Sequence, residues 1–341
     1  MDFSMAQLTY FQAVDMSTVP TWTGEFVVAQ SRYFGLQGTG NAGVYLGNFT
    51  YSDDGIVSGV VDGYDLFKGS SLEVQVRGVS FDGAAVQQAL VQGNHALLQS
   101  AALQGNDLVR GSSAADRLIG EGGNDLIYGL SGNDALLGGD GSDTLVGGPG
   151  NDTISGGAGL DYAVYAASAG QYSAQINDDG LLQVTDSIAV SRDGVDVLES
   201  IERLRFHDAD LALDTDGVAG QAYRIYKAAF NRQPDAEGLG FWIANMDAGV
   251  TLTEAAQGFL VSTEFQQLYG SNPTNEQFID LLYENVLQRE ADQSGYDFWI
   301  NAMNGGVSRA QVLAEFSESP ENQVNVEPLI ANGIFYTPFF G

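Results

Sequence analysis

The sequence predicts a multidomain protein that is mainly β with a separate α part. Three observations lead to this fold class. Short runs of alternating apolar and polar residues fill the first 100 residues, a nine-residue repeat runs from Ala102 to Val164, and a 57-residue repeat with helical character follows residue 217. A chain of 341 residues, at about 150 residues per domain, is expected to hold two or three domains.

Residues 1–100 are expected to form an antiparallel β-sandwich or small barrel. Alternating runs at Gly43–Tyr51, Ile56–Val61 and Leu72–Val79 are separated by turns rich in Asp, Gly and Lys. A helix is expected at Ala84–Gln92. A flat sheet face that carries aromatic residues would be a platform for a carbohydrate or another ligand, although aromatics in a sandwich more often belong to its core. The aromatic residues concerned are Tyr33, Phe34, Tyr45, Phe49, Tyr51, Tyr64 and Phe67.

Residues 101–164 repeat every nine residues, as in GEGGNDLIY from Gly120 to Tyr128. Glycines at the first and fourth positions are expected to let the backbone turn through left-handed conformations. Six turn residues and three strand residues make half of a flattened coil, so two units close one rung of a parallel stack, and each aspartate lies above the one eighteen residues later. The aspartates are Asp107, Asp116, Asp125, Asp134, Asp143, Asp152 and Asp161, and the single apolar residue of each strand is Leu118, Ile127, Leu136, Leu145 or Ile154.

Stacked carboxylates repel one another unless a cation lies between the rungs. The turns offer carboxylates, peptide carbonyls and Asn or Ser side chains, and this oxygen-only ligation suits calcium rather than zinc or copper. A flexible Gly-Asp linker is the alternative, but a linker does not keep a period. The ligands expected for several Ca²⁺ ions are Asp107, Asp116, Gly120, Gly122, Asn124, Asp125, Gly129, Asn133, Asp134, Gly138, Asp140, Asp143, Gly147, Asn151, Asp152, Gly156 and Asp161. The outer units depart from the pattern, with Ala102 and Ala114 at glycine positions and Arg117 after Asp116, so calcium is expected less at Asp107 and Asp116.

About seven units follow the pattern GGxGxDxUx and resemble the nonapeptides of repeat-in-toxin (RTX) proteins, which form calcium-binding β-rolls. The resemblance implies a secreted protein, extracellular or held at the cell surface, that leaves through the type I secretion machinery with an uncleaved C-terminal signal. The first residues, MDFSMAQLTY, lack the features of a cleavable signal peptide. The tail, residues 329–341, is uncharged and apolar as type I signals often are; the alternative is a last strand packed into a core.

The charge balance excludes some classes of partner. The chain has 44 acidic and 13 basic residues, a formal net charge of −31 and no cysteine. Nucleic acid and anionic membrane surfaces are therefore not expected partners, and no apolar stretch has the length of a transmembrane helix, so no membrane insertion is expected. Repulsion among the acids should couple folding of the roll to ion binding.

Residues 165–217 are expected to form a β segment that caps the roll. Strands are expected at Tyr172–Ile176 and Leu181–Thr185, and the stretch DGVDVLESIERLRFHDADLAL from Asp193 resembles the strand pair that closes RTX rolls.

Residues 218–328 are expected to form two helical units that repeat at an offset of 57 residues. Matched pairs at this offset include Tyr226 with Tyr283, Arg232 with Arg289, Asp235 with Asp292, Trp242 with Trp299 and Glu264 with Glu321. The units resemble the domain of unknown function 4214, which is frequent in secreted RTX and surface-layer proteins of Gram-negative bacteria. Asp235 and Asp292 are expected to be helix N-caps, and Arg232 to pair with the loop acid. The alternative is that the Arg and Trp residues contact a glycan.

Little in the sequence points to catalysis. His95 and His207 are the only side chains whose ordinary pKa suits acid–base work near neutral pH, and no motif for a nucleophile or catalytic metal accompanies them. We therefore expect no enzyme, although a carboxylate pair or a haem ligand in the N-terminal part remains an alternative. The expected function is a secreted calcium-binding structural protein that assembles with its own copies into a surface layer, filament or matrix, or binds cell-surface polysaccharide. The alternatives are a carbohydrate-binding adhesin module and an unrecognised hydrolase in residues 1–100.

Overall fold

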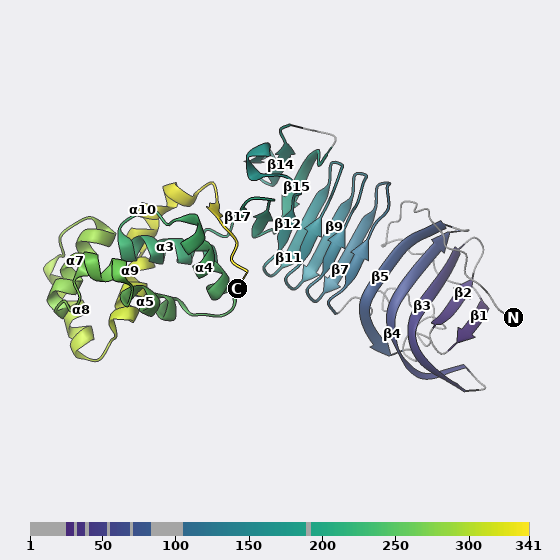
Figure 1. Cartoon of the computed structure of the whole chain (residues 1–341), viewed down its shortest axis with the longest axis horizontal. Coiled ribbons are helices and arrows are strands. Elements are labelled where there is room, and N and C mark those ends of the chain that lie inside the picture. The colour runs from purple at the N-terminus through teal and green to yellow at the C-terminus, as the bar shows by residue number, and fades with distance from the viewer. Residues whose placement is uncertain are drawn as a thin grey trace. The chain divides into compact units, whose positions relative to one another are not determined.

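A computed structural model describes the backbone of residues 25–30, 33–37, 41–52, 55–68 and 71–82, and all atoms of residues 105–188 and 192–340 (Figure 1). The chain divides into two compact units, one ending at His207 and the other beginning at Asp208. The helix expected at Ala84–Gln92 and the residue His95 lie outside the described residues. No helix within residues 105–188 or 192–340 is long and apolar enough to cross a bilayer.

Within the described segments of residues 25–82, five antiparallel strands follow one another. The three strands expected from the alternating sequence lie within the third, fourth and fifth of them. Each strand pairs with the next in the chain, and the closure of this sheet into a sandwich or barrel stays a prediction. The strands are β1 (Glu25–Gln30), β2 (Tyr33–Gln37), β3 (Asn41–Ser52), β4 (Gly55–Lys68) and β5 (Ser71–Asp82).

The nonapeptides form the predicted parallel stack. Successive strands alternate between two sheets, and each strand pairs in parallel with the strand eighteen residues later, as Leu126 does with Thr144 and Ala135 with Thr153. Figure 1 shows β7, β9 and β11 side by side in this ladder. One sheet contains β6 (Leu108–Arg110), β8 (Leu126–Tyr128), β10 (Thr144–Val146) and β12 (Tyr162–Val164), and the other contains β7 (Arg117–Gly122), β9 (Ala135–Asp140) and β11 (Thr153–Ala158).

The core of the roll is a single file of apolar side chains between the two sheets. The predicted core residues Leu118, Ile127, Leu136 and Leu145 are fully buried, and Ile154 is 1% exposed. Burial of one such side chain stabilises a fold by about 1.5–3 kcal/mol. Each half-turn buries only one of these side chains, whereas ordering its nine residues costs conformational entropy. The stability of the roll therefore depends on its turns as well as on its core.

The expectation about the turn glycines is half right. Position four is left-handed at Gly123, Gly132, Gly141 and Gly159, with φ from 115° to 143°, but not at Gly150. The second left-handed position is position two rather than position one, and it is occupied by Gly139 (φ 118°) and even by Leu130 (φ 79°). The position-one glycines have no positive φ, and they are required for a different reason, a close approach that is described with the metal centre below.

Residues 165–207 continue the first unit beyond the repeats. Strands β13 and β14 form an antiparallel hairpin next to β15, while β15 and β16 run parallel to β11 and β12. Tyr165, Tyr172 and Phe206 pack together with ring centroids 5.0–5.7 Å apart. The elements are η2 (Ala169–Gln171), β13 (Tyr172–Ile176), β14 (Leu182–Asp186), β15 (Val195–Glu199) and β16 (Arg203–Arg205).

The second unit contains the duplicated helices. Each helix of the first copy begins 57 residues before its counterpart, as α3 does with α7, so the sequence offset is also a structural one. Both repeats end in a fourth helix that the sequence analysis did not resolve. The first copy consists of α3 (Val218–Phe230), α4 (Ala236–Asp247), α5 (Leu252–Leu260) and α6 (Thr263–Tyr269), and the second of α7 (Asn275–Leu287), α8 (Gln293–Asn304), α9 (Arg309–Ser317) and α10 (Pro320–Ile330).

The C-terminal tail forms a strand in this second unit. Strand β18 (Ile334–Tyr336) pairs antiparallel with β17 (Asp210–Ala212), and both Ile334 and Tyr336 are buried. Of the two expectations for the tail, a last strand packed into a core therefore holds for Ile334 and Tyr336, while Phe335 between them is exposed. An export signal in the tail stays a prediction.

Candidate metal centre

Hydrogen bonds hold the repeat aspartates in two columns. In each column, Oδ1 of one carboxylate accepts the backbone N–H of the aspartate eighteen residues earlier, at 2.8 Å in every case. Asp107, Asp125, Asp143 and Asp161 form one column, and Asp116, Asp134 and Asp152 form the other. The predicted stacking at an interval of eighteen residues is confirmed.

The second oxygen of five carboxylates is buried without a hydrogen-bond partner. The residues are at most 2% exposed, and they are Asp125, Asp134, Asp143, Asp152 and Asp161. A buried carboxylate oxygen that lacks a donor costs free energy unless a cation or a proton compensates it. Five equivalent oxygens in this condition indicate a repeated ligand position rather than a local defect.

These unpartnered oxygens lie over the position-one glycines. A methyl group added to Gly138 would lie 2.2 Å from Asp143 Oδ2 and 2.4 Å from the carbonyl oxygen of Gly156 in the next rung. The same arrangement recurs at Gly120 and Gly129. We call this arrangement a cradle: a position-one glycine, the unpartnered aspartate oxygen five residues later, and the carbonyl oxygen of the glycine eighteen residues later, in the next rung. Only glycine leaves the space between the two oxygens open.

This donor set fits calcium. All the groups are oxygens, and their distribution over two rungs suits the flexible, many-ligand coordination of Ca²⁺. No three His, Asp or Glu side chains converge at one point within residues 105–188 and 192–340, so carbonyl groups must supply a large share of the ligands. The groups that would hold an ion are Oδ2 of the five aspartates and the carbonyls of glycines such as Gly138 and Gly156. A bound ion would supply the positive charge that these carboxylates lack.

The outer units differ, as their sequences suggested. Asp116 Oδ2 accepts hydrogen bonds from both the backbone N–H and the hydroxyl of Ser112, at 2.6 and 2.9 Å. This carboxylate is therefore compensated within its own turn. At Asp107, in the first rung, both carboxylate oxygens are buried without a hydrogen-bond partner.

The predicted asparagine ligands take part in a separate ladder. The side-chain oxygens of Asn124, Asn133 and Asn151 accept backbone N–H groups of the next rung, from Ser142, Asn151 and Val195 respectively. These bonds lie at the exposed side of the turns and hold successive rungs in register. Two other predicted ligands, Gly122 and Asp140, face each other as backbone partners in β7 and β9. Their role as calcium ligands stays a prediction.

Two acids that were not predicted as ligands continue the columns. Asp196 Oδ1 accepts the N–H of Asp152, and Glu202 Oε2 accepts the N–H of Asp161, both at 2.9 Å. Each acid is followed two residues later by a buried leucine, Leu198 or Leu204, which is the acid-x-Leu pattern of the repeats. That pattern was a signal in the sequence, but it lacks the flanking glycines.

Burial raises the pKa of the stacked carboxylates. It raises the pKa of Asp134 to about 7 and those of Asp125 and Asp161 to about 6, with neighbouring carboxylates adding to the effect and the backbone N–H donors opposing it. The folded, metal-free roll therefore holds protons more tightly than the unfolded chain does. Its stability should be highest near pH 4 and should fall as the pH rises through 6 to 7.

We therefore expect the calcium-free roll to be most stable at pH 5, and to lose its melting transition or to melt at a lower temperature as the pH rises to 8. Circular dichroism of protein freed of calcium, in calcium-free buffer at pH 5, 6, 7 and 8, measures this. Saturating calcium should remove the trend, because the ion takes the place of the protons. A calcium-free roll that is more stable at pH 8 than at pH 5 would contradict the assigned burial of these carboxylates.

The duplicated Arg and Trp residues of the helical unit serve its packing. Arg232 forms two hydrogen bonds to Glu264 at 2.6 and 3.0 Å and lies over the ring of Tyr226, while its contact with the loop acid Asp235 is longer, at 3.5 Å. Its main partner is therefore Glu264 and not the expected Asp235. Asp235 is an N-cap as predicted, accepting from Gly238 N–H at 2.7 Å. The second copy repeats these contacts: Arg289 binds Glu321, Asp292 caps α8, and Trp299 packs on Phe316 as Trp242 packs on Phe259.

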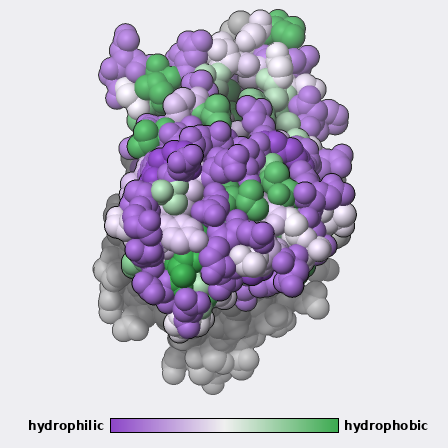
Figure 2. Space-filling view, turned by 90° about the vertical axis from the view of Figure 1, so that its left-hand side faces the viewer, coloured by the Kyte–Doolittle hydropathy of each residue, from purple (hydrophilic) through white to green (hydrophobic). Residues whose placement is uncertain are grey.

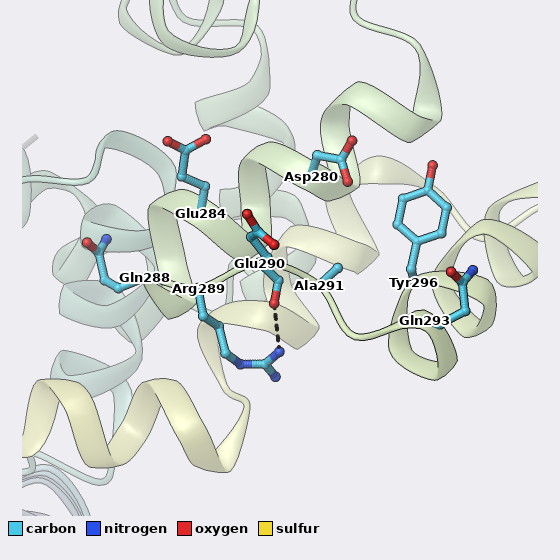
Figure 3. A pocket seen from close by; sticks show the side chains of 8 residues that line it. All are labelled: Asp280, Glu284, Gln288, Arg289, Glu290, Ala291, Gln293 and Tyr296. Carbon is cyan, nitrogen blue, oxygen red and sulfur yellow. Dashed lines mark hydrogen bonds between the residues drawn. The ribbon is translucent and has the colours of Figure 1, made fainter.

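An open hollow of about 760 Å³ lies beside Arg289 (Figure 3). Three acidic side chains, Asp280, Glu284 and Glu290, line it together with Arg289. The Arg289 guanidinium is already bonded to Glu321 and to the carbonyl of Glu290. The hollow therefore offers an anionic glycan more repulsion than attraction. Contact of the Arg and Trp residues with a glycan stays a prediction.

His207, the histidine within the residues that the structure describes, is exposed on the chain segment after β16. Its backbone N–H donates to the carbonyl of Ala167.

Comparison with known families identifies two parts of the chain. The RTX calcium-binding nonapeptide repeat (4 copies) matches residues 102–136 and 137–164, and the domain of unknown function DUF4214 matches residues 221–266 and 256–326. The chain thus carries RTX repeats, which bind calcium, and a DUF4214 domain, as its sequence indicated. Neither family describes an enzyme. No match was found among curated proteins.

Among solved structures, the extracellular lipase LipA from Serratia marcescens is similar over 30% of this chain, at 20% identity and a TM-score of 0.16. The similar region spans 16% of the lipase chain. A likeness of this extent carries no inference about activity.

Proposed function

We propose that this protein is a secreted structural protein whose roll folds when calcium binds and which then assembles with its own copies into a surface layer, filament or matrix. RTX repeats bind calcium and are typical of secreted proteins. The observation that carries the proposal is the set of five buried carboxylate oxygens without partners. A roll built this way is stable only where calcium is plentiful, which is the condition outside the cell.

The assembly part of the proposal is supported by the organisation of the chain. One unit is a β-structure and the other is helical, and two unlike units permit heterologous, head-to-tail contacts between copies. On the side shown in Figure 2, where the helical unit faces the viewer, apolar residues form small groups among hydrophilic ones. Exposed aromatic residues, such as Phe298 and Phe340, offer contact points of limited size for such an assembly.

Light scattering and electron microscopy of the purified protein across a calcium titration test the proposal. We expect ordered sheets or fibres to form only with calcium, in the millimolar range typical of extracellular calcium modules. Magnesium at the same ionic strength is the control. A protein that stays monomeric at every calcium concentration would reject self-assembly and leave the calcium-folded roll as a scaffold for another function.

The second candidate is a carbohydrate-binding module in the N-terminal sheet. Its backbone register pairs Phe34 with Tyr45 and Tyr45 with Tyr64, so three aromatic residues occupy one row across β2, β3 and β4. Such rows can stack against sugar rings. Binding to a glycan array that is lost in Tyr45→Ala but kept in Tyr296→Ala, a change in the helical unit, would favour this function. An array without any signal would leave the structural role.

A further inference from the structure

The roll is one turn longer than its nonapeptides. Strand β15 pairs in parallel with β11, Val197 facing Thr153, and β16 pairs in parallel with β12, Arg203 facing Tyr162. The side chains that follow in the core are Leu198 at 2% exposure and Leu204, which is fully buried. Neither family match includes this segment, because the RTX repeats match up to residue 164 and DUF4214 matches from residue 221 onward.

The sequence of this last turn imitates a repeat unit. In SRDGVDVLE, Gly194 takes position four, Asp196 position six and Leu198 position eight. Gly194 has a φ of 70°, and a methyl group on it would lie 2.0 Å from the carbonyl oxygen of Gly150. The equivalent distance from Gly159 to the Gly141 carbonyl oxygen is 1.9 Å, so the backbone of the last turn stacks as a genuine repeat does.

The last turn also completes a cradle of the kind described for Gly138. A methyl group on Gly156 would lie 2.1 Å from the carbonyl oxygen of Ser200 and 2.6 Å from Asp161 Oδ2. Ser200 therefore takes the place that Gly156 holds in the Gly138 cradle, and it does so with a left-handed φ of 50°. Asp161 is fully buried, and its Oδ2 has no hydrogen-bond partner.

Glu202 then occupies the position of the next aspartate in the column. Its Oε2 accepts the N–H of Asp161 at 2.9 Å, as Asp161 Oδ1 accepts the N–H of Asp143. The Glu202 carbonyl accepts from Arg203 Nη1 at 3.1 Å, and the carboxylate is the group of Glu202 that we assign to an ion. A glutamate reaches farther than an aspartate. This length suits the shortened last turn, in which Val197 and Arg203 are six residues apart, whereas their strand partners Thr153 and Tyr162 are nine residues apart.

We propose that this non-repeat turn forms a further calcium site, held by Asp161 Oδ2, the Ser200 carbonyl and the Glu202 carboxylate, at the C-terminal end of the roll. The proposal rests on calcium binding by the inner rungs, because it extends the same cradle by one turn. A calcium ion here links the last repeat to the segment that covers it. With this site, the roll binds one calcium ion more than the nonapeptides alone would bind.

The test is the calcium stoichiometry of the full chain by titration calorimetry. Glu202→Gln should bind one ion fewer than the wild type, or hold one ion at least tenfold more weakly. Glu199→Gln changes an exposed carboxylate on β15 and should leave the count unchanged. A Glu202→Gln protein with the wild-type count and affinities would overturn the proposal.

A second comparison keeps the test decisive if Glu202→Gln alters folding. Asp161→Asn preserves the side-chain oxygen that accepts from Asp143 and should remove the same ion. Adding Glu202→Gln to Asp161→Asn should then cost no additional ion, whereas the loss of a second ion would show that the two acids serve different sites and would reject the proposal. A wild-type chain that binds no calcium would instead reject the function proposed for the whole roll.

Discussion

At neutral pH, removal of calcium is expected to unfold the roll, residues 105–205, and to leave the helical unit, residues 208–340, folded. Without the ion, five buried carboxylates have an oxygen that nothing compensates, in a chain with a net charge of −31. Each site stabilises the fold by about 1.4 kcal/mol when calcium is at ten times its Kd, so several sites together decide whether so narrow a roll is stable. The helical unit has its own apolar core, built around residues such as Phe278 and Leu313.

Hydrogen exchange measured by mass spectrometry distinguishes the two units. With calcium, the amides of β7, β9 and β11 should be protected; after chelation they should exchange rapidly, while amides of α3 and α7 stay protected. Restoring calcium should restore protection, and magnesium should not. Roll amides that remain protected in chelator at neutral pH would contradict a calcium-dependent fold.

Gly138→Ala should both destabilise the roll and remove a ligand position. Its new methyl group would lie 2.2 Å from Asp143 Oδ2 and 2.4 Å from a backbone carbonyl, and neither can move without breaking the stack. We expect a loss of about 1–3 kcal/mol from overpacking, together with the loss of the ion held by Asp143. Calcium-dependent thermal melting and titration calorimetry measure the two effects.

Gly170→Ala is the matched control. Gly170 belongs to the same unit, in η2, and a methyl group there meets no atom within 4 Å. Its melting temperature and calcium count should equal those of the wild type. If Gly138→Ala behaves like Gly170→Ala, the cradle described for the position-one glycines is not a ligand site.

The regular parts of the roll could be predicted because a nine-residue period determines both pairing and burial. Once two units make one rung, the interval of eighteen residues places Asp125 under Asp143 and Leu118 under Leu136, as the structure shows. The same reasoning could not distinguish the roles of the two turn glycines. A left-handed conformation and a close backbone approach both favour glycine, so the sequence alone does not separate position two from position one.

The end of the roll could not be read in full from the sequence because its period is broken. An insertion, residues 165–190, separates the last strand of the repeats from the next turn, and the following turn loses three residues. Asp196 and Glu202 therefore fall out of register with Asp152 and Asp161 in the sequence while they remain in register in space.

In the helical unit, the duplicated sequence predicted duplicated contacts but not their partners. The N-caps Asp235 and Asp292 follow from local sequence, because an N-cap bonds within its own turn. The pairing of Arg232 with Glu264 joins residues 32 positions apart, which local reasoning did not connect. The offset that matched Glu264 with Glu321 was the available signal.

Calcium titration calorimetry of the wild type and of Asp134→Ala/Asp143→Ala tests the metal centre most directly. The two aspartates lie in the middle of different columns, and each has a buried oxygen without a partner. We expect the double variant to bind fewer ions and to melt at a lower temperature in calcium. An unchanged titration curve in a folded double variant would show that the stacked aspartates are not the calcium ligands.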